Sequence, residues 1–287
     1  MSFRKKNILC RIYFVLLLLL GITGCHIREE AEQNTVLLDS NNPFSGKIAF
    51  LHIDQLSKSE NIFIADENDL RELSTNLKNI MDLAWHPNGK SIIFSASVEG
   101  YNQIYTVDIK NTNITQLTYG QTSSYSPSWS PDGKYIIFLS QHVSNQSMND
   151  APIQSGYVME SNGMKQYLFT EKFGFVKSVS WYGNSNLISL SVPESRYTLK
   201  VTLVDVNGVR QSEFPEKIIG GMPNWSLDGE AIVYTPFIAS SNCSNIIVYE
   251  GDSLEQECLV IDTLSPPTLN KMPSWGPGNE YLFLLQM

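Results

Sequence analysis

The stretch that decides the fold is Ser128-Trp129-Ser130-Pro131-Asp132-Gly133-Lys134, which leads into the apolar run at residues 135–139. An Asp-Gly pair beside a β-rich apolar run is a strong local signal for a hairpin, because such turns need residues that tolerate positive φ. Similar stretches recur, and each contains one of the five tryptophans: Trp85, Trp129, Trp181, Trp225 and Trp275. The tryptophans are 44, 52, 44 and 50 residues apart, a period typical of β-propeller blades.

Each copy of the repeat has the pattern of a four-stranded antiparallel blade. After the turn come an apolar run, a polar loop and a second apolar run, and a short turn rich in Asn, Asp and Gly leads to a last strand. Because no segment shows a sustained helical period, we expect an all-β chain. A degenerate copy without tryptophan, at residues 42–47, brings the number of copies to six.

The number of blades follows from counting the expected strands. We expect six blades with the last one incomplete, because there are six copies of the second strand but five complete pairs of third and fourth strands. Five blades are the alternative, with the segment around Trp275 closing the first blade. Residues 35–39 could lend a strand to the first or the last blade. Either closure would cover sheet edges that an open array exposes.

The repeat resembles the TolB-like, WD-like propeller repeat that is often called PD40. Residues 128–134 reproduce its core almost letter for letter, and the resemblance extends over residues 44–287. It implies a TolB-like β-propeller domain at residues 43–287, and it says little about function. The chain departs from the repeat at Tyr182-Gly183-Asn184, which lacks the Pro-Asp-Gly turn, and at residues 42–47, which lack the tryptophan.

Residues 1–24 have the features of an export signal. Basic residues precede nine apolar residues, 12–20, which are fewer than the about 20 that a membrane-spanning helix needs. The following Ile22-Thr23-Gly24-Cys25 resembles the lipobox of bacterial lipoproteins, in which the signal is cleaved before the cysteine and the cysteine is acylated. The resemblance implies a lipidated Cys25, and residues 25–42 then form the anchor and a flexible tether. An ordinary secretory leader with a chance cysteine is the alternative.

The charge of the chain indicates which surfaces it avoids. Without the leader and its four basic residues, 16 basic residues face 29 acidic ones, a net charge of −13. So acidic a body disfavours nucleic acids and anionic lipid heads, so we expect membrane contact through the lipid alone. The resemblance implies an extracytoplasmic location. In a two-membrane bacterium, His26 in place of an aspartate after the cysteine favours the outer membrane facing the periplasm, and with one membrane the protein lies on the outer face.

No catalytic or metal-binding motif is present in the sequence, so we expect no enzyme activity, no cofactor and no metal. The histidines do not fall at the spacing of metal ligands. We interpret His86 as a surface turn residue, whereas His52 and His142 are weak site candidates. Prolyl-oligopeptidase-type peptidases carry similar propeller repeats, but their catalytic groups belong to a separate α/β-hydrolase domain, which we do not expect here.

We expect a non-catalytic binding module. The alternative function is an enzyme acting on carbohydrate or peptide, or a small-ligand sensor, with a site at the mouth of the central channel. Asp82, three residues before a tryptophan, is expected on an innermost strand and could face this channel. Glycosidases need two carboxylates. The equivalent positions in the other copies are Ser126, Ser178, Met222 and Met272.

Cys243 and Cys258 are the only cysteines after Cys25. They flank an expected hairpin near residues 251–252, on facing strands that are two or three residues out of register. In an exported protein a disulfide between them is the favoured interpretation. The geometry needs a bulge or loop slack, so two free buried thiols are the alternative.

A partner-binding face follows from propeller topology. Loops that join second to third strands, and loops that join successive blades, lie at one end of the ring, and the longest of them is residues 140–156. Aromatic residues and methionine are enriched at protein interfaces. We expect an unidentified protein or envelope polymer to bind there, with a merely solvated face as the alternative. The candidate contact residues are Tyr119, Tyr125, His142, Met148, Asp150, Phe173, Phe175, Met222 and Phe237.

Overall fold

The computed structural model describes residues 47–53, 60–66, 69–142, 153–195, 198–213, 220–226, 228–236, 246–250, 255–259, 270–275 and 282–286. Within these ranges, no helix has the length and apolar character needed to cross a membrane. Several sequence predictions fall on other residues and lie outside the described ranges: the lipidated Cys25, the strand at residues 35–39, Cys243, Met148, Asp150 and Phe237.

The described strands form six antiparallel sheets. The first sheet contains β1 (Ile48–Ile53), β2 (Glu60–Ala65) and β3 (Leu70–Leu73). The second contains β4 (Lys78–Trp85), β5 (Ser91–Val98), β6 (Tyr101–Asp108) and β7 (Ile114–Gln116), and the third contains β8 (Ser124–Trp129), β9 (Tyr135–His142), β10 (Ile153–Glu160) and β11 (Tyr167–Leu168). The fourth contains β12 (Ser178–Trp181), β13 (Ile188–Pro193), β14 (Leu199–Val204) and β15 (Arg210–Glu213). The fifth contains β16 (Gly220–Trp225), β17 (Ala231–Pro236), β18 (Ile246–Glu250) and β19 (Glu255–Leu259), and the sixth contains β20 (Asn270–Trp275) and β21 (Leu282–Gln286). A short 3-10 helix, η2 (Glu171–Phe173), lies between β11 and β12.

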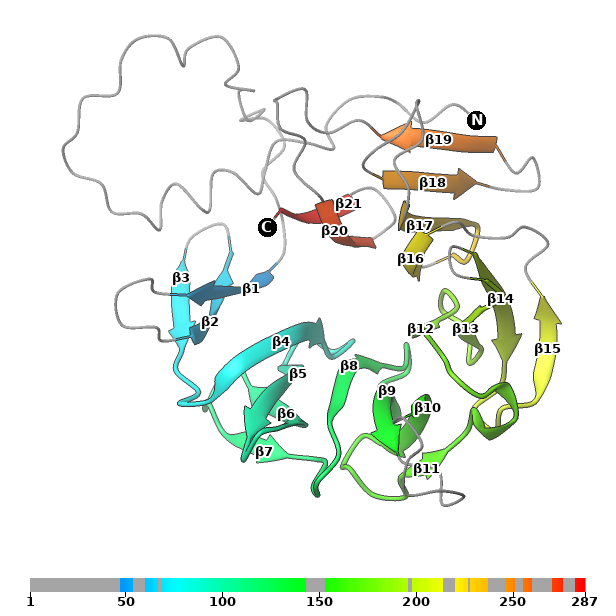
Figure 1. Cartoon of the computed structure of the whole chain (residues 1–287). Helices are drawn as coiled ribbons and strands as arrows, with labels where there is room; N and C mark the ends of the chain where they lie inside the picture. Colours follow the sequence, from blue (N-terminus) through cyan, green and yellow to red (C-terminus); the bar gives the residue numbers. More distant parts are fainter. Residues whose placement is uncertain are drawn as a thin grey trace, which may run out of the picture.

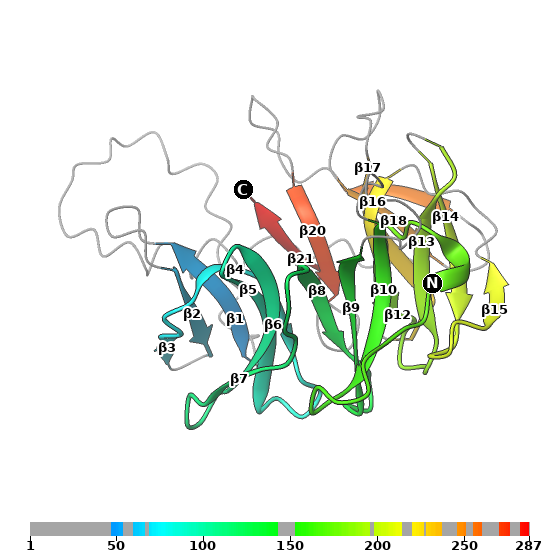
Figure 2. The same cartoon turned by 60° about the horizontal axis from the view of Figure 1, so that its bottom comes forward.

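The six sheets are arranged around a centre in chain order, as in a β-propeller (Figure 1). Seen from the side, the strands of neighbouring sheets stand next to one another (Figure 2). In every complete sheet the strands pair in sequence order, from an innermost strand that ends in tryptophan to a short outer strand. Among the described strands, β20 and β21 form a sheet of their own beside β16 and β17, and they do not pair with β1–β3. This arrangement agrees with the expected all-β propeller and with the count of six.

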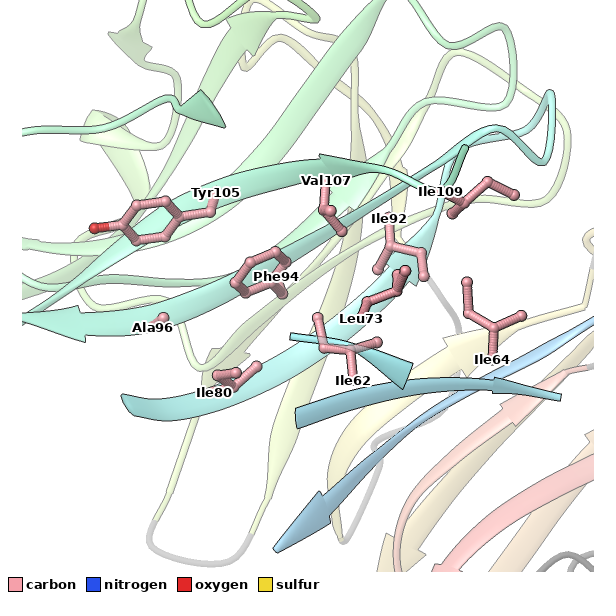
Figure 3. Close-up of a cluster of buried hydrophobic side chains, with 10 residues drawn as sticks. All are labelled: Ile62, Ile64, Leu73, Ile80, Ile92, Phe94, Ala96, Tyr105, Val107 and Ile109. Carbon is pink, nitrogen blue, oxygen red and sulfur yellow. The ribbon is translucent and has the colours of Figure 1, made fainter. Parts of the chain in front are cut away.

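Hydrophobic side chains fill the seams between neighbouring sheets. Figure 3 shows the seam between the first two sheets, where Ile62 and Leu73 meet Ile80, Ile92 and Phe94. All of these side chains are at most 2% exposed. Sheets without helical cover can bury their faces only against each other, so the regular apolar runs of the sequence become the inter-blade core.

The repeated tryptophans pack between neighbouring sheets. Trp129 joins a cluster with Ile93 and Ile104 of the preceding sheet. Trp181 packs in the same way with Ile137 and Val158. Burying such a ring removes about 150–250 Å² from water, so each tryptophan is a large contribution to its seam.

His86 is not a plain surface residue, in contrast to its interpretation from the sequence. Its ring lies edge-on against Trp129 of the next sheet, with 4.5 Å between ring centroids. A Cβ atom at Gly133 would lie 2.6 Å from the imidazole Cε1 atom, so the glycine makes room for the ring. Tyr182 meets Trp225 in the same geometry at 4.7 Å. In these two seams, the residue after one tryptophan therefore covers the tryptophan of the following sheet.

The Asp-Gly turn of the third sheet is closed by one carboxylate. Asp132 accepts hydrogen bonds from the Ser130 hydroxyl at 2.7 Å, from the Lys134 backbone N–H at 3.1 Å and from Lys134 Nζ at 2.8 Å. The Lys134 ammonium and the Ser130 hydroxyl together lower the pKa of Asp132 to about 2. The turn is therefore held best while this carboxyl is ionised.

Acidification is expected to remove the contribution of Asp132 to stability. Its pKa is lower in the folded chain than in the unfolded one, so the stabilisation is complete above about pH 4 and is lost as the pH falls through about 2. Because the turn is exposed and screened by solvent, we expect less than about 1 kcal/mol. Urea unfolding of the wild type and of Asp132→Asn at pH 5 and pH 2 measures it. The second sheet carries Asn88 in this turn, so the variant should fold, and a wild-type advantage that persists unchanged at pH 2 would contradict the assignment.

Candidate functional site

The end of the ring that carries the β5–β6 turn and the connections between successive sheets is called the connection face here. In an antiparallel sheet, successive hairpins lie at opposite ends, so these segments share one end and the tryptophan turns share the other. Among the described residues of the connection face, three large aromatic side chains are exposed. Tyr119 of the β7–β8 connection is 73% exposed, Phe175 of the β11–β12 connection is 44% exposed, and Tyr101 at the start of β6 is 37% exposed.

Tyr119 is exposed but held in place. Its hydroxyl donates a hydrogen bond to the backbone carbonyl of Gln116 at 3.0 Å. The Gln116 side chain in turn donates to the carbonyl of Thr118 at 2.8 Å, which braces the same short loop. An aromatic ring fixed at its hydroxyl end presents apolar area to a partner at little cost in conformational entropy. Tyr119 therefore has the geometry of a contact residue.

Tyr125 is used inside the protein instead. Its hydroxyl donates to the side-chain oxygen of Gln154 at 2.5 Å, and the Gln154 amide donates to the carbonyls of Val176 and Lys177 at 2.8 and 3.0 Å. Burial raises the pKa of the Tyr125 hydroxyl, which further favours its protonated, hydrogen-bond-donating form. The pair ties β8 and β10 to the connection that leads into the fourth sheet. Tyr125 therefore orders the connection face without being its most accessible part.

The two phenylalanines of the β11–β12 connection have different roles. Phe173, in η2, is half-buried against the core cluster that includes Val176, and the guanidinium of Arg210 lies 5.8 Å from its ring centroid. Phe175, two residues later, points to solvent over nearly half of its surface. The structure thus assigns Phe173 to packing and leaves Phe175 available for contact.

Of the remaining predicted contact residues, His142 and Met222 are placed only by their backbones. His142 ends β9, opposite Ile153 of β10, and Met222 lies where the pairing of β16 with β17 shifts register. The loop predicted at residues 140–156 is shorter than expected, because residues 140–142 and 153–156 belong to β9 and β10.

The weaker site candidates also have structural contacts. Asp82 Oδ2 accepts hydrogen bonds from the Ser95 hydroxyl at 3.0 Å and from the Ser126 backbone N–H at 2.9 Å, so it joins the innermost strands of two neighbouring sheets. The His52 ring lies edge-on against Phe63 at 5.4 Å. In the part of the chain that the structure describes, no three His, Cys, Asp or Glu side chains are placed to hold a metal ion. Cys258 pairs across the strands with Ile247, and Cys243 lies outside the described ranges.

Two threonines with a structural role were not singled out by sequence reasoning. Thr118 accepts a hydrogen bond from the Ile104 N–H at 2.8 Å, and Thr170 accepts one from the Gly156 N–H at 2.8 Å. Each hydroxyl thus accepts a hydrogen bond from the third strand of its sheet, just beyond the end of the short outer strand. The signal was available, since a threonine follows the apolar residue after the fourth strand in both repeats, in Leu117-Thr118 and Phe169-Thr170.

Comparison with protein families finds a match to the model described as TolB beta propeller domain, PD40, over residues 32–167. Among curated proteins, the Tol-Pal system protein TolB of Francisella tularensis is 26% identical over 153 residues, which are 53% of this chain and 34% of that protein. The uncharacterized protein Atu1656 of Agrobacterium fabrum is 22% identical over 169 residues, 53% of each chain. The chain thus spans about half or less of the length of these relatives.

Solved structures show the same fold. TolB from Acinetobacter baumannii superposes with a TM-score of 0.55 at 22% identity, covering 73% of this chain and 50% of that one. An oligogalacturonate lyase from Vibrio parahaemolyticus superposes with a TM-score of 0.57 at 12% identity, covering 78% of this chain and 68% of that one. TolB and a lyase therefore share this architecture, and the function has to be argued from the surface of this chain.

Proposed function

We propose that this TolB-like PD40 β-propeller is a membrane-anchored, extracytoplasmic binding module that holds a protein or envelope polymer on its connection face and does not act as an enzyme. The observation that carries the proposal is the pair of exposed aromatic side chains, Tyr119 and Phe175, on neighbouring inter-blade connections. Aromatic residues are frequent at the energetic centres of interfaces, because they bury large areas and lose little rotamer freedom.

The hydrogen bonds behind this face support a binding role. Gln103 donates to the carbonyls of Gly120 and Thr122 at 3.1 and 3.0 Å and thereby fixes the loop that carries Tyr119. Gln154 fixes the connection before β12 through two backbone carbonyls. A preordered surface avoids the entropic cost of ordering loops during association. The leader and Cys25 support an anchored, extracytoplasmic location.

A matched set of surface variants tests the proposal. Tyr119→Ser with Phe175→Ser removes the exposed rings, and Met164→Ser removes a side chain that is 64% exposed in the β10–β11 turn at the other end of the ring. Cross-linking in native envelopes followed by affinity purification should recover the same partners with the wild type and with Met164→Ser. The double variant should recover them at least about tenfold less, as expected for loss of interface hot spots. An unchanged set of partners with the double variant would refute the proposed face.

A further inference from the structure

The seam between the fourth and fifth sheets differs from the others in its chemistry. In these sheets, the tryptophan of the innermost strand pairs with a residue of the second strand. The residue that follows this partner is Ser189 in β13, whereas it is Ile93, Ile137 and Val233 in the second, third and fifth sheets. Two residues further on stands Ser191, which pairs with Ser178 of β12, and Ser189 pairs with Ser180. Paired residues of an antiparallel sheet share a face, so four serines gather on one face of the fourth sheet.

This serine face is turned towards the fifth sheet. Ile188 and Leu190, which alternate with the two serines of β13, pack with the third sheet, so the serines point the other way. Val201, the partner of Ser191 on β14, packs against Trp225 and Ile232 of the fifth sheet. Ser189 and Ser191 are each 1% exposed. Their hydroxyls therefore lie inside the seam.

Neither of these two hydroxyls has a hydrogen-bond partner among the described protein groups. The second sheet shows how such a group is otherwise satisfied. There Ser95, which corresponds to Ser191, donates to the carboxylate of Asp82 at 3.0 Å. In the fourth sheet the residue three before the tryptophan is Ser178 instead of an aspartate, so this acceptor is missing. A buried hydroxyl without any partner costs free energy, so such groups are normally paired with protein or water.

The seam also has less side chain to fill it. In β13, Ser189 stands where the second and third sheets have isoleucine. Ser191 stands where the third sheet has Leu139. On the opposite sheet, the fully buried Tyr234 occupies the position of Phe94 and Phe138. A polar site with room and several hydrogen-bonding groups is the kind that holds ordered water.

We propose that Ser189 and Ser191 bind ordered water between the fourth and fifth sheets. The water accepts from and donates to the two buried hydroxyls, and Ser178 and Ser180, which are partly exposed on the innermost strand, continue the polar surface towards the centre of the ring. This ligand site belongs to one seam, because the second, third and fifth sheets have Ile93, Ile137 and Val233 at the position of Ser189.

Alanine variants distinguish a hydrated seam from a dry one. If water satisfies the hydroxyls, Ser189→Ala and Ser191→Ala each lose hydrogen bonds, and the midpoint of thermal unfolding should fall by about 2–4 °C. If the hydroxyls are dry, deleting them removes a desolvation cost, so an unchanged or raised midpoint would overturn the proposal. Ser95→Ala, which removes a hydroxyl with a known partner, calibrates the size of the loss.

A crystal structure of the wild-type protein gives the direct readout. Electron density for a water within hydrogen-bond distance of Ser189 Oγ or Ser191 Oγ is the expected result. A seam without such density, in a map that shows other buried waters, would overturn the proposal even if the alanine variants are destabilised.

Discussion

The Gly208→Ala variant is expected to lose about 3–5 kcal/mol of its free energy of unfolding, a large part of the 5–15 kcal/mol typical of a folded domain. Gly208 lies in the β14–β15 turn with φ +75°, where an L-residue costs about 1–2 kcal/mol. A Cβ atom there would also fall on the carbonyl oxygen of Phe169 in the preceding sheet. Phe169 is buried, and its N–H donates to the Gly156 carbonyl, so this backbone cannot easily move away.

Gly89 provides the matched control for the backbone term. It also follows an asparagine in a turn and has positive φ, +67°, but a Cβ atom at this position would meet nothing within 4 Å. Gly89→Ala should therefore lose only about 1–2 kcal/mol. Urea unfolding of both variants measures the difference, which isolates the contact between sheets. Equal losses would show that Gly208 does not closely approach the neighbouring sheet.

The difference between these two glycines shows where sequence reasoning stops. The turns themselves were predictable, because Asp-Gly and Asn-Gly pairs specify local backbone geometry, and the six copies of the repeat, one of them without tryptophan, predicted six sheets. Which glycine faces a neighbouring backbone depends on how two sheets pack, and no local pattern contains that information. For the same reason His86 was read as a surface residue, although its ring covers Trp129 of the next sheet.

The face that carries the candidate site was predictable from the sequence. Which of its aromatic residues are exposed and which pack inside the protein was not. Propeller topology correctly placed Tyr119 and Phe175 on exposed inter-blade connections. It did not distinguish these exposed residues from Tyr125 and Phe173, which are also aromatic residues near the same connections but are partly buried. The deciding partner of Tyr125 is Gln154, 29 residues away, so its burial follows from tertiary contacts that a single sequence does not display.

Replacement of Cys25 is expected to abolish lipid attachment completely. Two or more acyl chains hold a protein stably on a bilayer, because each buried CH₂ group contributes about 0.8 kcal/mol, whereas one chain gives only marginal binding. Metabolic labelling with a fatty-acid analogue should mark the wild-type protein and leave Cys25→Ala unlabelled. Cys10→Ala, which changes the cysteine inside the leader, should keep the full label. Label retained on Cys25→Ala would contradict the predicted anchor site.

The position of the propeller relative to the membrane depends on the same residue. The uncleaved leader of Cys25→Ala can itself hold the chain at the membrane, so fractionation of that variant alone is not decisive. A chain exported with an ordinary cleavable leader in place of residues 1–25 removes both attachments. We expect it in the soluble extracytoplasmic fraction, because the acidic body has no electrostatic attraction to anionic lipid heads. If this chain instead sediments with membranes, the folded domain binds the envelope directly, and the connection face becomes the first surface to vary, starting with Tyr119.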